Sequence, residues 1–456
     1  MNEKNNLSNK VSLSGRLSYA LTDASGNLLY CIIGAYLLYF LTDVYGLSVG
    51  VTGTLLLATR LLDAIDAPAW GFIVDHTKSK YGQSRPYFLW LCIPFALFMW
   101  LTFTTPGLDG AAKVIYVVVI YILAGIFYTG IQTAITSVLP NLTNDPGERV
   151  LLNTFRMVGG NVGAFVAITF TLPLVAFLGG GNDQKGFSMT LAVYAIVAVI
   201  LFLIAFTNLR EINIEKIKKI PIKQSVMAIK GNWPWIIIVT ANLIFWVALT
   251  IRQSTLIYYL QYYIGDKSLV PFINGLTVLQ VIGMISIPLL VKFSSKYATM
   301  IIGLILAAVG HLIMFFAGAT VSALAIGWII ASIGSGIACS MPFAMLSDTV
   351  DYGEWKNGIR ASGFLTAIGS AFCIKAGSGI GGFIPAMVMD YFGYVPNAVQ
   401  SANSLLGIQL IFIWIPMVIF LLGIFPMLFY RKFEQNEGQV IMEIEQKSLP
   451  TNGFNC

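Results

Sequence analysis

The sequence predicts an all-α integral membrane protein with twelve transmembrane helices. Of its 456 residues, 57% are hydrophobic and only 11% are charged, and the mean hydropathy is +0.78. Soluble domains are typically about 45–50% apolar and about 25% charged, so this composition excludes that class. The apolar stretches are long enough for membrane helices of about 20 residues, whereas the strands of a membrane barrel alternate over about 10.

The apolar segments follow one another at short intervals. The polar first 16 residues have no apolar core, so we expect no cleaved signal peptide, and the first helix serves as the insertion signal. The five cysteines lack the spacing of a disulfide framework or a metal site. The expected helices cover residues 17–41, 49–73, 87–105, 113–139, 151–178, 187–208, 233–263, 269–291, 297–317, 321–347, 362–389 and 404–430.

The basic residues predict the orientation in the membrane. Of the 27 Lys and Arg residues, 20 fall on the side that holds both termini, three on the opposite side and four within helices. Cytoplasmic loops carry the excess of basic residues, so we expect a cell-membrane protein with both termini in the cytoplasm. The net charge of +6 reflects this bias and indicates no nucleic-acid partner.

The longest interior loop, residues 210–230, divides the helices six and six. We therefore expect five regions: a cytoplasmic N-terminal tail (1–16), a six-helix bundle (17–208), a cytoplasmic middle loop (209–232), a second six-helix bundle (233–430) and a cytoplasmic tail (431–456).

The two halves share a short pattern. Residues 143–148 read T-x-D-x-G-E after the fourth expected helix, and residues 349–354 repeat it 206 positions later, after the tenth. The helices that follow are rich in small residues, which allow close helix packing, at Gly159, Gly160, Gly163, Gly377, Gly379, Gly381 and Gly382. Two matched half-bundles around a mid-membrane site are typical of alternating-access carriers.

Three charged residues occur inside the second expected helix. Arg60, Asp63 and Asp66 follow each other at i,i+3 spacing, so they project onto one helix face. A charge at mid-bilayer costs about 2.5–3.5 kcal/mol on insertion scales, so such groups normally face a bundle interior or an aqueous cavity. This face is a candidate ion or proton site, and the alternative is a structural pairing of the carboxylates with Arg60 or with Lys375 of another helix.

Five motifs occur along the expected membrane domain. They are Arg16-Leu-Ser-Tyr19 with Asp23 and Asn27, Leu41-Thr-Asp43-Val-Tyr-Gly-Leu-Ser-Val-Gly50, Asp63-Ala-Ile-Asp66-Ala-Pro68, Gly71-x3-Asp75-x-Thr77-x8-Pro86 and Asp348-Thr-Val-Asp-Tyr-Gly-Glu-Trp-Lys356. These motifs resemble those of the glycoside-pentoside-hexuronide:cation symporters, a family of the major facilitator superfamily. The resemblance spans about residues 16–430 and implies the major facilitator fold and sugar uptake coupled to Na⁺ or H⁺.

The resemblance implies a cation site at Asp63, Asp66 and Thr129. Asp63 and Thr129 match an aspartate and a threonine of the family's cation site, and Asp66 replaces an asparagine. Ala67 stands where that site has its second aspartate, so one carboxylate has moved about 100° around the helix. A hard cation needs several oxygen ligands, whereas a proton needs one carboxylate. We therefore favour H⁺ over Na⁺ at Asp63 and Asp66, and expect no other metal and no cofactor.

The resemblance also implies a sugar site formed by Asn27, Gln132, Arg156 and Lys375. Two family carboxylates are amides here, while Asp23 lies one turn before Asn27 on the same face, so we expect a different sugar. Further candidates are Tyr30 and Tyr128, which could stack on a sugar ring or simply pack between helices, and Arg252, which would suit an acidic sugar if it faces the cavity.

Charged residues at the cytoplasmic helix ends are candidate gates, because ion pairs there can form in one conformation and separate in another. Ordinary solvation is the alternative for each of them. The candidates are Asp75, Arg85, Arg149, Asp351, Glu354 and Arg360.

The sequence therefore favours a cation-coupled sugar symporter that works as a monomer in the lipid bilayer, with a small sugar as its partner. An uncoupled sugar facilitator and a lipid carrier of the same superfamily stay open. A membrane enzyme fits least, because neither an HExxH nor a GxSxG pattern occurs.

Overall fold

The protein is helical almost throughout in a computed structural model that describes residues 11–77, 79–143, 146–211, 227–359, 362–436 and 442–443. Nine helical stretches within these ranges are long and apolar enough to cross a membrane, judged by length and composition. They are Gly110–Leu139, Leu151–Gly179, Asp183–Asn208, Trp233–Ile264, Lys267–Phe293, Lys296–Ala317, Val321–Asn357, Phe364–Tyr391 and Ala402–Glu434. The all-α prediction is confirmed.

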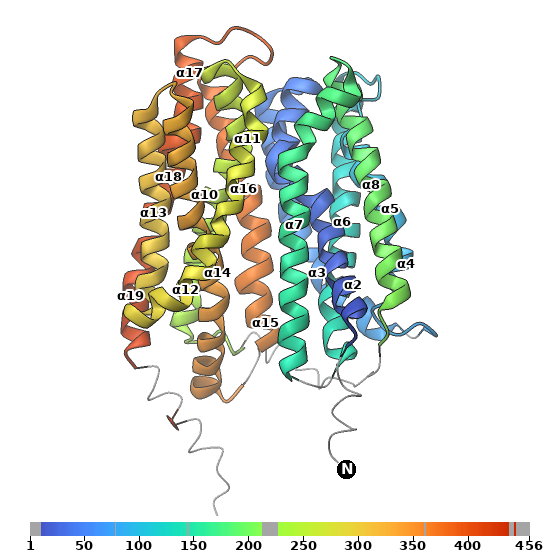
Figure 1. The fold of residues 1–456 in the computed structure, drawn as a ribbon, viewed down its shortest axis with the longest axis vertical. Coiled ribbons are helices and arrows are strands. Elements are labelled where there is room, and N and C mark those ends of the chain that lie inside the picture. The colour runs from blue at the N-terminus through green and yellow to red at the C-terminus, as the bar shows by residue number, and fades with distance from the viewer. Residues whose placement is uncertain are drawn as a thin grey trace, which may run out of the picture. The chain divides into compact units, whose positions relative to one another are not determined.

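The three other predicted segments are also helical, and the count of twelve membrane spans stays a prediction. Figure 1 follows the helices in chain order. They are α2 (Leu13–Ile32), η1 (Ile33–Leu37), η2 (Phe40–Val44), α3 (Val49–His76), α4 (Pro86–Trp90), α5 (Cys92–Thr102), α6 (Gly110–Leu142), α7 (Pro146–Gly179), α8 (Asp183–Asn208), α10 (Trp233–Tyr258), η3 (Tyr259–Ile264), η4 (Lys267–Leu269), α11 (Val270–Gly275), η5 (Leu276–Leu279), α12 (Gln280–Phe293), α13 (Lys296–Ala317), α14 (Val321–Asn357), α15 (Ser362–Ala367), η6 (Ile368–Phe372), α16 (Cys373–Tyr391), α17 (Ala402–Gln409), η7 (Leu410–Trp414), α18 (Ile415–Leu422) and α19 (Ile424–Glu434).

The predicted end of the tenth helix at residue 347 is wrong. Helix α14 continues to Asn357, where Gly358 adopts a left-handed φ of 65° and donates its N–H to the Glu354 carbonyl at 2.8 Å. Apolar character ends ten residues before the helix does, because polar residues continue a helix until a stop such as this glycine cap. The repeated T-x-D-x-G-E pattern therefore lies inside α14 in the second half, whereas in the first half α6 ends just before it and α7 begins at Pro146.

Contacts between residues divide the chain into two compact units. The first comprises Met1–Ile217, Gln253–Gly275 and Gly382–Ile408, and the second comprises Lys218–Arg252, Leu276–Gly381 and Gln409–Cys456. The first unit combines the first sequence half with two segments of the second half, and the second unit holds the rest of the second half. The predicted boundaries of two six-helix bundles stay a prediction.

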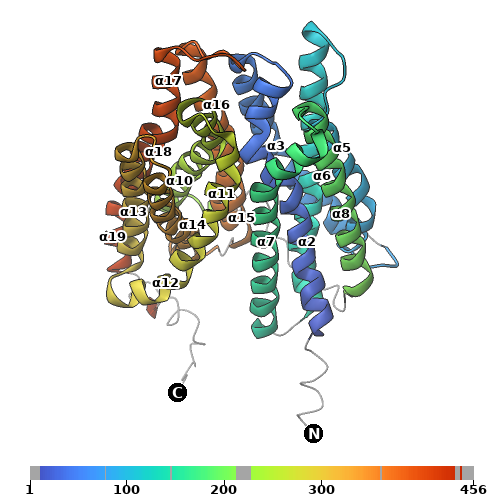
Figure 2. The same ribbon diagram turned by 45° about the horizontal axis from the view of Figure 1, so that its top comes forward.

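Close contact of α7 with α2 organises the first unit. The two helices lie side by side (Figure 1), as they also do in the second view (Figure 2). A Cβ at Gly159 would lie 2.1 Å from the Ala20 carbonyl oxygen, and one at Gly163 would lie 2.2 Å from that of Ala24. Only glycine permits this approach, so the expected role of these residues in close helix packing is confirmed.

Glycine contacts also organise the second unit, where α13 packs along α14. A Cβ at Gly310 would lie 2.4 Å from the Ala331 amide nitrogen, and one at Gly334 would lie 2.4 Å from that of Ala307. A Cβ at Gly377 of α16 would likewise lie 2.6 Å from the Trp246 Cβ of α10. Buried apolar side chains such as Phe245, Met341 and Phe420 fill the core beside these contacts.

In each unit, the carboxylate of a glutamate accepts hydrogen bonds from backbone N–H groups where another helix begins. Glu211, after α8, accepts the backbone N–H groups of Gln83, Ser84 and Arg85 at 2.9, 2.8 and 2.6 Å, just before α4 begins. In the second unit, Glu434 at the end of α19 accepts the N–H groups of Lys296 and Tyr297 at 2.6 and 3.0 Å, where α13 begins. A carboxylate at a helix start satisfies donors that have no partner within the helix. The two halves, which share a short sequence pattern, thus also share this hydrogen-bonding arrangement.

We expect Gly163→Ala to destabilise the protein, because the new methyl would meet the Ala24 backbone, which cannot move aside. Overpacking of this kind lowers the free energy of unfolding by roughly 1–3 kcal/mol. Gly34→Ala is the matched control, since a Cβ there would meet no atom within 4 Å. Thermal unfolding of both variants in detergent would measure the difference, and equal midpoints would contradict this account of the α2–α7 contact.

Candidate functional site

Polar side chains from three helices meet in the first unit around Asp23, which is 7% exposed. Gln132 of α6 donates from Nε2 to the Asp23 Oδ1 at 3.3 Å, and Arg156 of α7 places Nη1 3.8 Å from the same oxygen. Asn27, one turn along α2, donates from Nδ2 to the Asp23 carbonyl at 3.0 Å. The structure therefore brings four of the predicted sugar-site residues into one cluster, which we call the Asp23 cluster.

Gly160 of α7 makes room for the Asp23 cluster. A Cβ at this position would lie 2.6 Å from Asp23 Oδ2 and 2.9 Å from Asn27 Nδ2. Arg156 is held in place by a second bond, from its Nε to the Asn153 Oδ1 at 3.1 Å. The Gln132 Oε1 is buried and has no hydrogen-bond partner within the described part of the chain. A buried acceptor without a protein partner is costly unless a ligand or water satisfies it.

Tyr30 and Tyr128, the two predicted aromatic residues of the sugar site, stack on each other. The two rings are parallel within 4° and their centroids are 3.8 Å apart. Arg60 places its guanidinium carbon 4.9 Å from the Tyr30 ring centroid, and its Nη1 donates to the Tyr30 hydroxyl. Tyr128 thus covers one face of the Tyr30 ring, and Arg60 contacts the ring and binds its hydroxyl group. Stacking on a sugar would require the two rings to separate, and that role stays a prediction.

The predicted cation site is only partly described. Asp63 lies in α3, but its side chain is outside the described residues. Asp66 is half-buried on the same helix, and Thr129 of α6 is buried, with its hydroxyl donating to the Gly125 carbonyl at 3.0 Å. Arg60 is 3% exposed, so α3 does bury a charge within the first unit. The assignment of these residues to a cation stays a prediction.

Two predicted basic residues lie in the second unit. Lys375 is 9% exposed on α16. Arg252 is 1% exposed, and its Nη2 donates to the Ser332 hydroxyl at 2.7 Å and to the Trp328 carbonyl at 3.1 Å. Its guanidinium carbon also lies 3.8 Å from the Trp328 ring centroid. Arg252 thus ties α10 to α14 and presents no surface to a ligand in this arrangement.

Two of the predicted gate residues donate hydrogen bonds to nearby backbone carbonyls, and the gating role stays a prediction. Arg85 donates from Nε to the Phe206 carbonyl at 2.7 Å, and Arg149 donates from Nε to that of Thr143 at 2.9 Å. Asp351 and Glu354 are half-buried on α14, while the Asp75 side chain and Arg360 lie outside the described residues.

The described residues also form ion pairs that the sequence did not predict, among them one between Arg16 and Glu148 and one between Lys296 and Asp348. Arg16 donates to both carboxylate oxygens of Glu148, at 2.8 and 2.9 Å, and Lys296 lies 2.7 Å from Asp348. Arg16, Glu148 and Asp348 belong to motifs singled out in the sequence, but those motifs did not indicate the partners.

The chain matches the family described as MFS/sugar transport protein over residues 18–431. An isoprimeverose transporter of Lactiplantibacillus pentosus is 40% identical, with 98% of this chain and 94% of the relative aligned. A putative sulfoquinovose importer of Escherichia coli (strain K12) is 29% identical over 98% of this chain and 97% of its own. The fold is similar to that of a bacterial homologue of the human lysosomal transporter Spinster, at 13% identity and a TM-score of 0.69 over 93% of this chain and 97% of that one.

We expect Gly160→Ala to weaken ligand binding while leaving the fold intact. The new methyl would push the tips of Asp23 and Asn27 aside, and these tips can move at little cost to packing. Displacing one charge-assisted contact lowers affinity by about tenfold. Isothermal titration with a transported sugar would measure the loss, and the thermal midpoint would serve as the folding control. An unchanged affinity would show that the Asp23 cluster does not bind the sugar.

Proposed function

Because the chain belongs to the MFS/sugar transport protein family, we propose that it is a secondary active transporter that takes up a small glycoside by alternating access, together with a cation. The Asp23 cluster carries this proposal. It offers guanidinium and amide donors beside carboxylate and amide acceptors, the mixed set that sugar hydroxyls require. The unsatisfied Gln132 Oε1 supports a ligand at this position.

A neutral disaccharide such as isoprimeverose is the first substrate to test. The relative named for that sugar is the one at 40% identity. Within the Asp23 cluster the negative charge of Asp23 and the positive charge of Arg156 offset each other, so the cluster carries no excess charge for an anionic sugar. Another relative is named for sulfoquinovose, an anionic sugar, whose charge would need an additional cationic side chain. The sequence prediction gave that part to Arg252, which is buried in the second unit and held by α14.

The coupling ion is proposed to be H⁺, bound at Asp63 or Asp66. Arg60 lies one turn before Asp63 on α3 and is buried, so this part of the helix already holds a charge inside the first unit. The replacement of an aspartate by Ala67 removes an oxygen ligand that Na⁺ would use. We further propose a multi-pass protein of the cell membrane that works as a monomer, with both termini in the cytoplasm, because the basic loops fall on that side.

Counterflow in proteoliposomes tests this proposal. Liposomes loaded with unlabelled isoprimeverose should take up labelled sugar, and an imposed H⁺ gradient should drive accumulation above equilibrium. If only a Na⁺ gradient drives accumulation, the coupling ion is Na⁺ and not H⁺. If counterflow occurs without accumulation under either gradient, the protein is an uncoupled facilitator. Exchange of lysolipids without any sugar exchange would overturn the proposal in favour of a lipid carrier.

Asp63→Asn is expected to abolish gradient-driven accumulation while counterflow continues, because coupling requires that the cation and the sugar raise each other's affinity. Asp66→Asn, measured in parallel, shows which carboxylate carries the ion. Asp109→Asn is a matched control, since Asp109 is exposed before α6. Full accumulation by both of the first two variants would exclude this face of α3 as the coupling site.

A further inference from the structure

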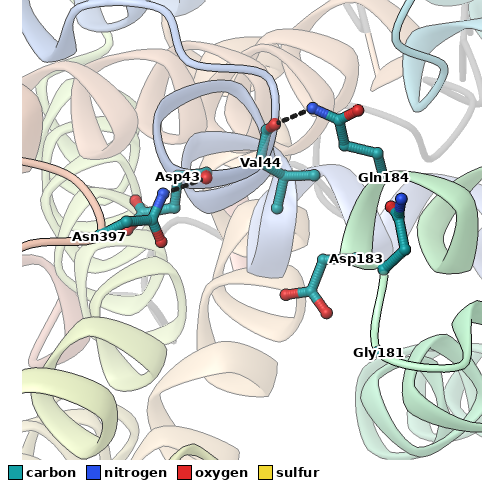
Figure 3. A pocket seen from close by; sticks show the side chains of 7 residues that line it. Asp43, Val44, Gly181, Asp183, Gln184 and Asn397 are labelled. Atoms are coloured by element: carbon teal, nitrogen blue, oxygen red, sulfur yellow. Dashed lines mark hydrogen bonds between the residues drawn. The ribbon is translucent and has the colours of Figure 1, made fainter.

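A second polar cluster occurs in the first unit, at the end of the molecule that the sequence predicts to face outward. Its centre is Asp43 in η2, within the motif of residues 41–50, and Asp43 is 7% exposed. The proposed function assigns this motif no part. In the same region Asp43, Val44, Asp183, Gln184 and Asn397 line a surface pocket (Figure 3).

The Asp43 carboxylate accepts hydrogen bonds from hydroxyl groups of residues far apart in the chain. Its Oδ1 accepts a hydrogen bond from the Tyr262 hydroxyl and one from the Tyr394 hydroxyl at 2.6 Å. Its Oδ2 accepts from the Thr42 hydroxyl at 2.7 Å. Tyr262 belongs to η3 and Tyr394 follows α16, so this carboxylate joins the first membrane segment to two segments of the second sequence half.

Asn397 adds two bonds to the same centre. Its Nδ2 donates to the Asp43 carbonyl at 2.6 Å, as Figure 3 shows, and its backbone N–H donates to the Tyr262 hydroxyl at 3.0 Å. Asn397 has a φ of 56°, the only positive φ of a non-glycine residue in the described ranges. Asparagine tolerates this left-handed conformation better than most residues, and the two bonds hold it there.

Further bonds surround this centre. The Thr42 and Tyr258 hydroxyls lie 2.8 Å apart, and Lys267 donates to the Tyr39 hydroxyl at 2.9 Å and to Asp183 at 2.6 Å. The Lys267–Asp183 pair is 30% and 41% exposed, so water weakens it. Asp43 is the buried acceptor of the set, and bonds to a buried carboxylate are stronger than bonds between neutral groups.

Every bond of this cluster that joins the two sequence halves must break if the outer ends of those halves separate. From this geometry we propose that Asp43 is the central acceptor of an outer latch, made with Tyr262, Tyr394 and Asn397, which closes the outer side of the carrier and opens when sugar binds from outside. This inference rests on the proposed transport function. While the latch is closed, hydroxyl groups compensate the buried carboxylate, and when it opens, water takes their place. The carboxylate therefore lets the latch alternate between two states without leaving a buried charge unsatisfied in either.

Access to Cys31 from outside tests the latch. Cys31 is partly buried on α2, with its Sγ 3.5 Å from the Asn27 Oδ1, and lies twelve residues before Asp43 in the chain. In a chain whose other four cysteines are replaced by serine, a membrane-impermeant thiol reagent added outside would label Cys31 when the outer side is open. We expect Asp43→Asn to label about tenfold faster, since it loses charge-assisted bonds.

Tyr262→Phe and Tyr394→Phe each remove one hydroxyl donor to Asp43. Cys31 should be labelled faster in these variants than in the parent chain, but less so than in Asp43→Asn. These variants also keep the test decisive if Asp43→Asn fails to fold. Asp109→Asn, the same change at an exposed position expected on the same side, should label like the parent chain. Parent-like labelling of all latch variants that fold would overturn the latch. Faster labelling in a chain that moves no sugar would keep the latch and overturn the proposed substrate, so the two failures can be told apart.

Discussion

The contact between the backbones of α2 and α7 is the constraint on which the Asp23 cluster depends. Glycines at positions 159 and 163 bring α7 against the carbonyl groups of Ala20 and Ala24, closer than any side chain would allow. At this separation Arg156 reaches Asp23, and the missing side chain of Gly160 leaves space for Asp23 and Asn27. Packing and chemistry therefore cannot be separated along this face, because the same small residues set the helix distance and the shape of the site.

The sequence predicted the family and most helix limits well, for different reasons. The family match over residues 18–431 confirms the resemblance that rested on long motifs. Apolar runs predict helices because a membrane helix needs about 20 such residues. The same signal failed at α14, where polar residues continue the helix to the glycine cap at Gly358.

The candidate site was predicted only in part, because hydropathy does not tell which way a side chain points around its helix. Asp23, Gln132 and Arg156 do converge. Arg252, by contrast, points into the packing between α10 and α14. The partners of Asp43 could not be predicted either, because Tyr262 and Tyr394 are far along the chain and contribute hydroxyl groups that carry no charge pattern.

The burial of Arg252 has a consequence for how the chain is assembled. Its guanidinium is held by Ser332, Ser335 and Trp328, all of which are synthesised about 80 residues later. An arginine inside a membrane helix is expensive until its partners are present. During biosynthesis α10 therefore gains these partners only after α14 has been made, and a chain that stops before α14 would leave this arginine without them.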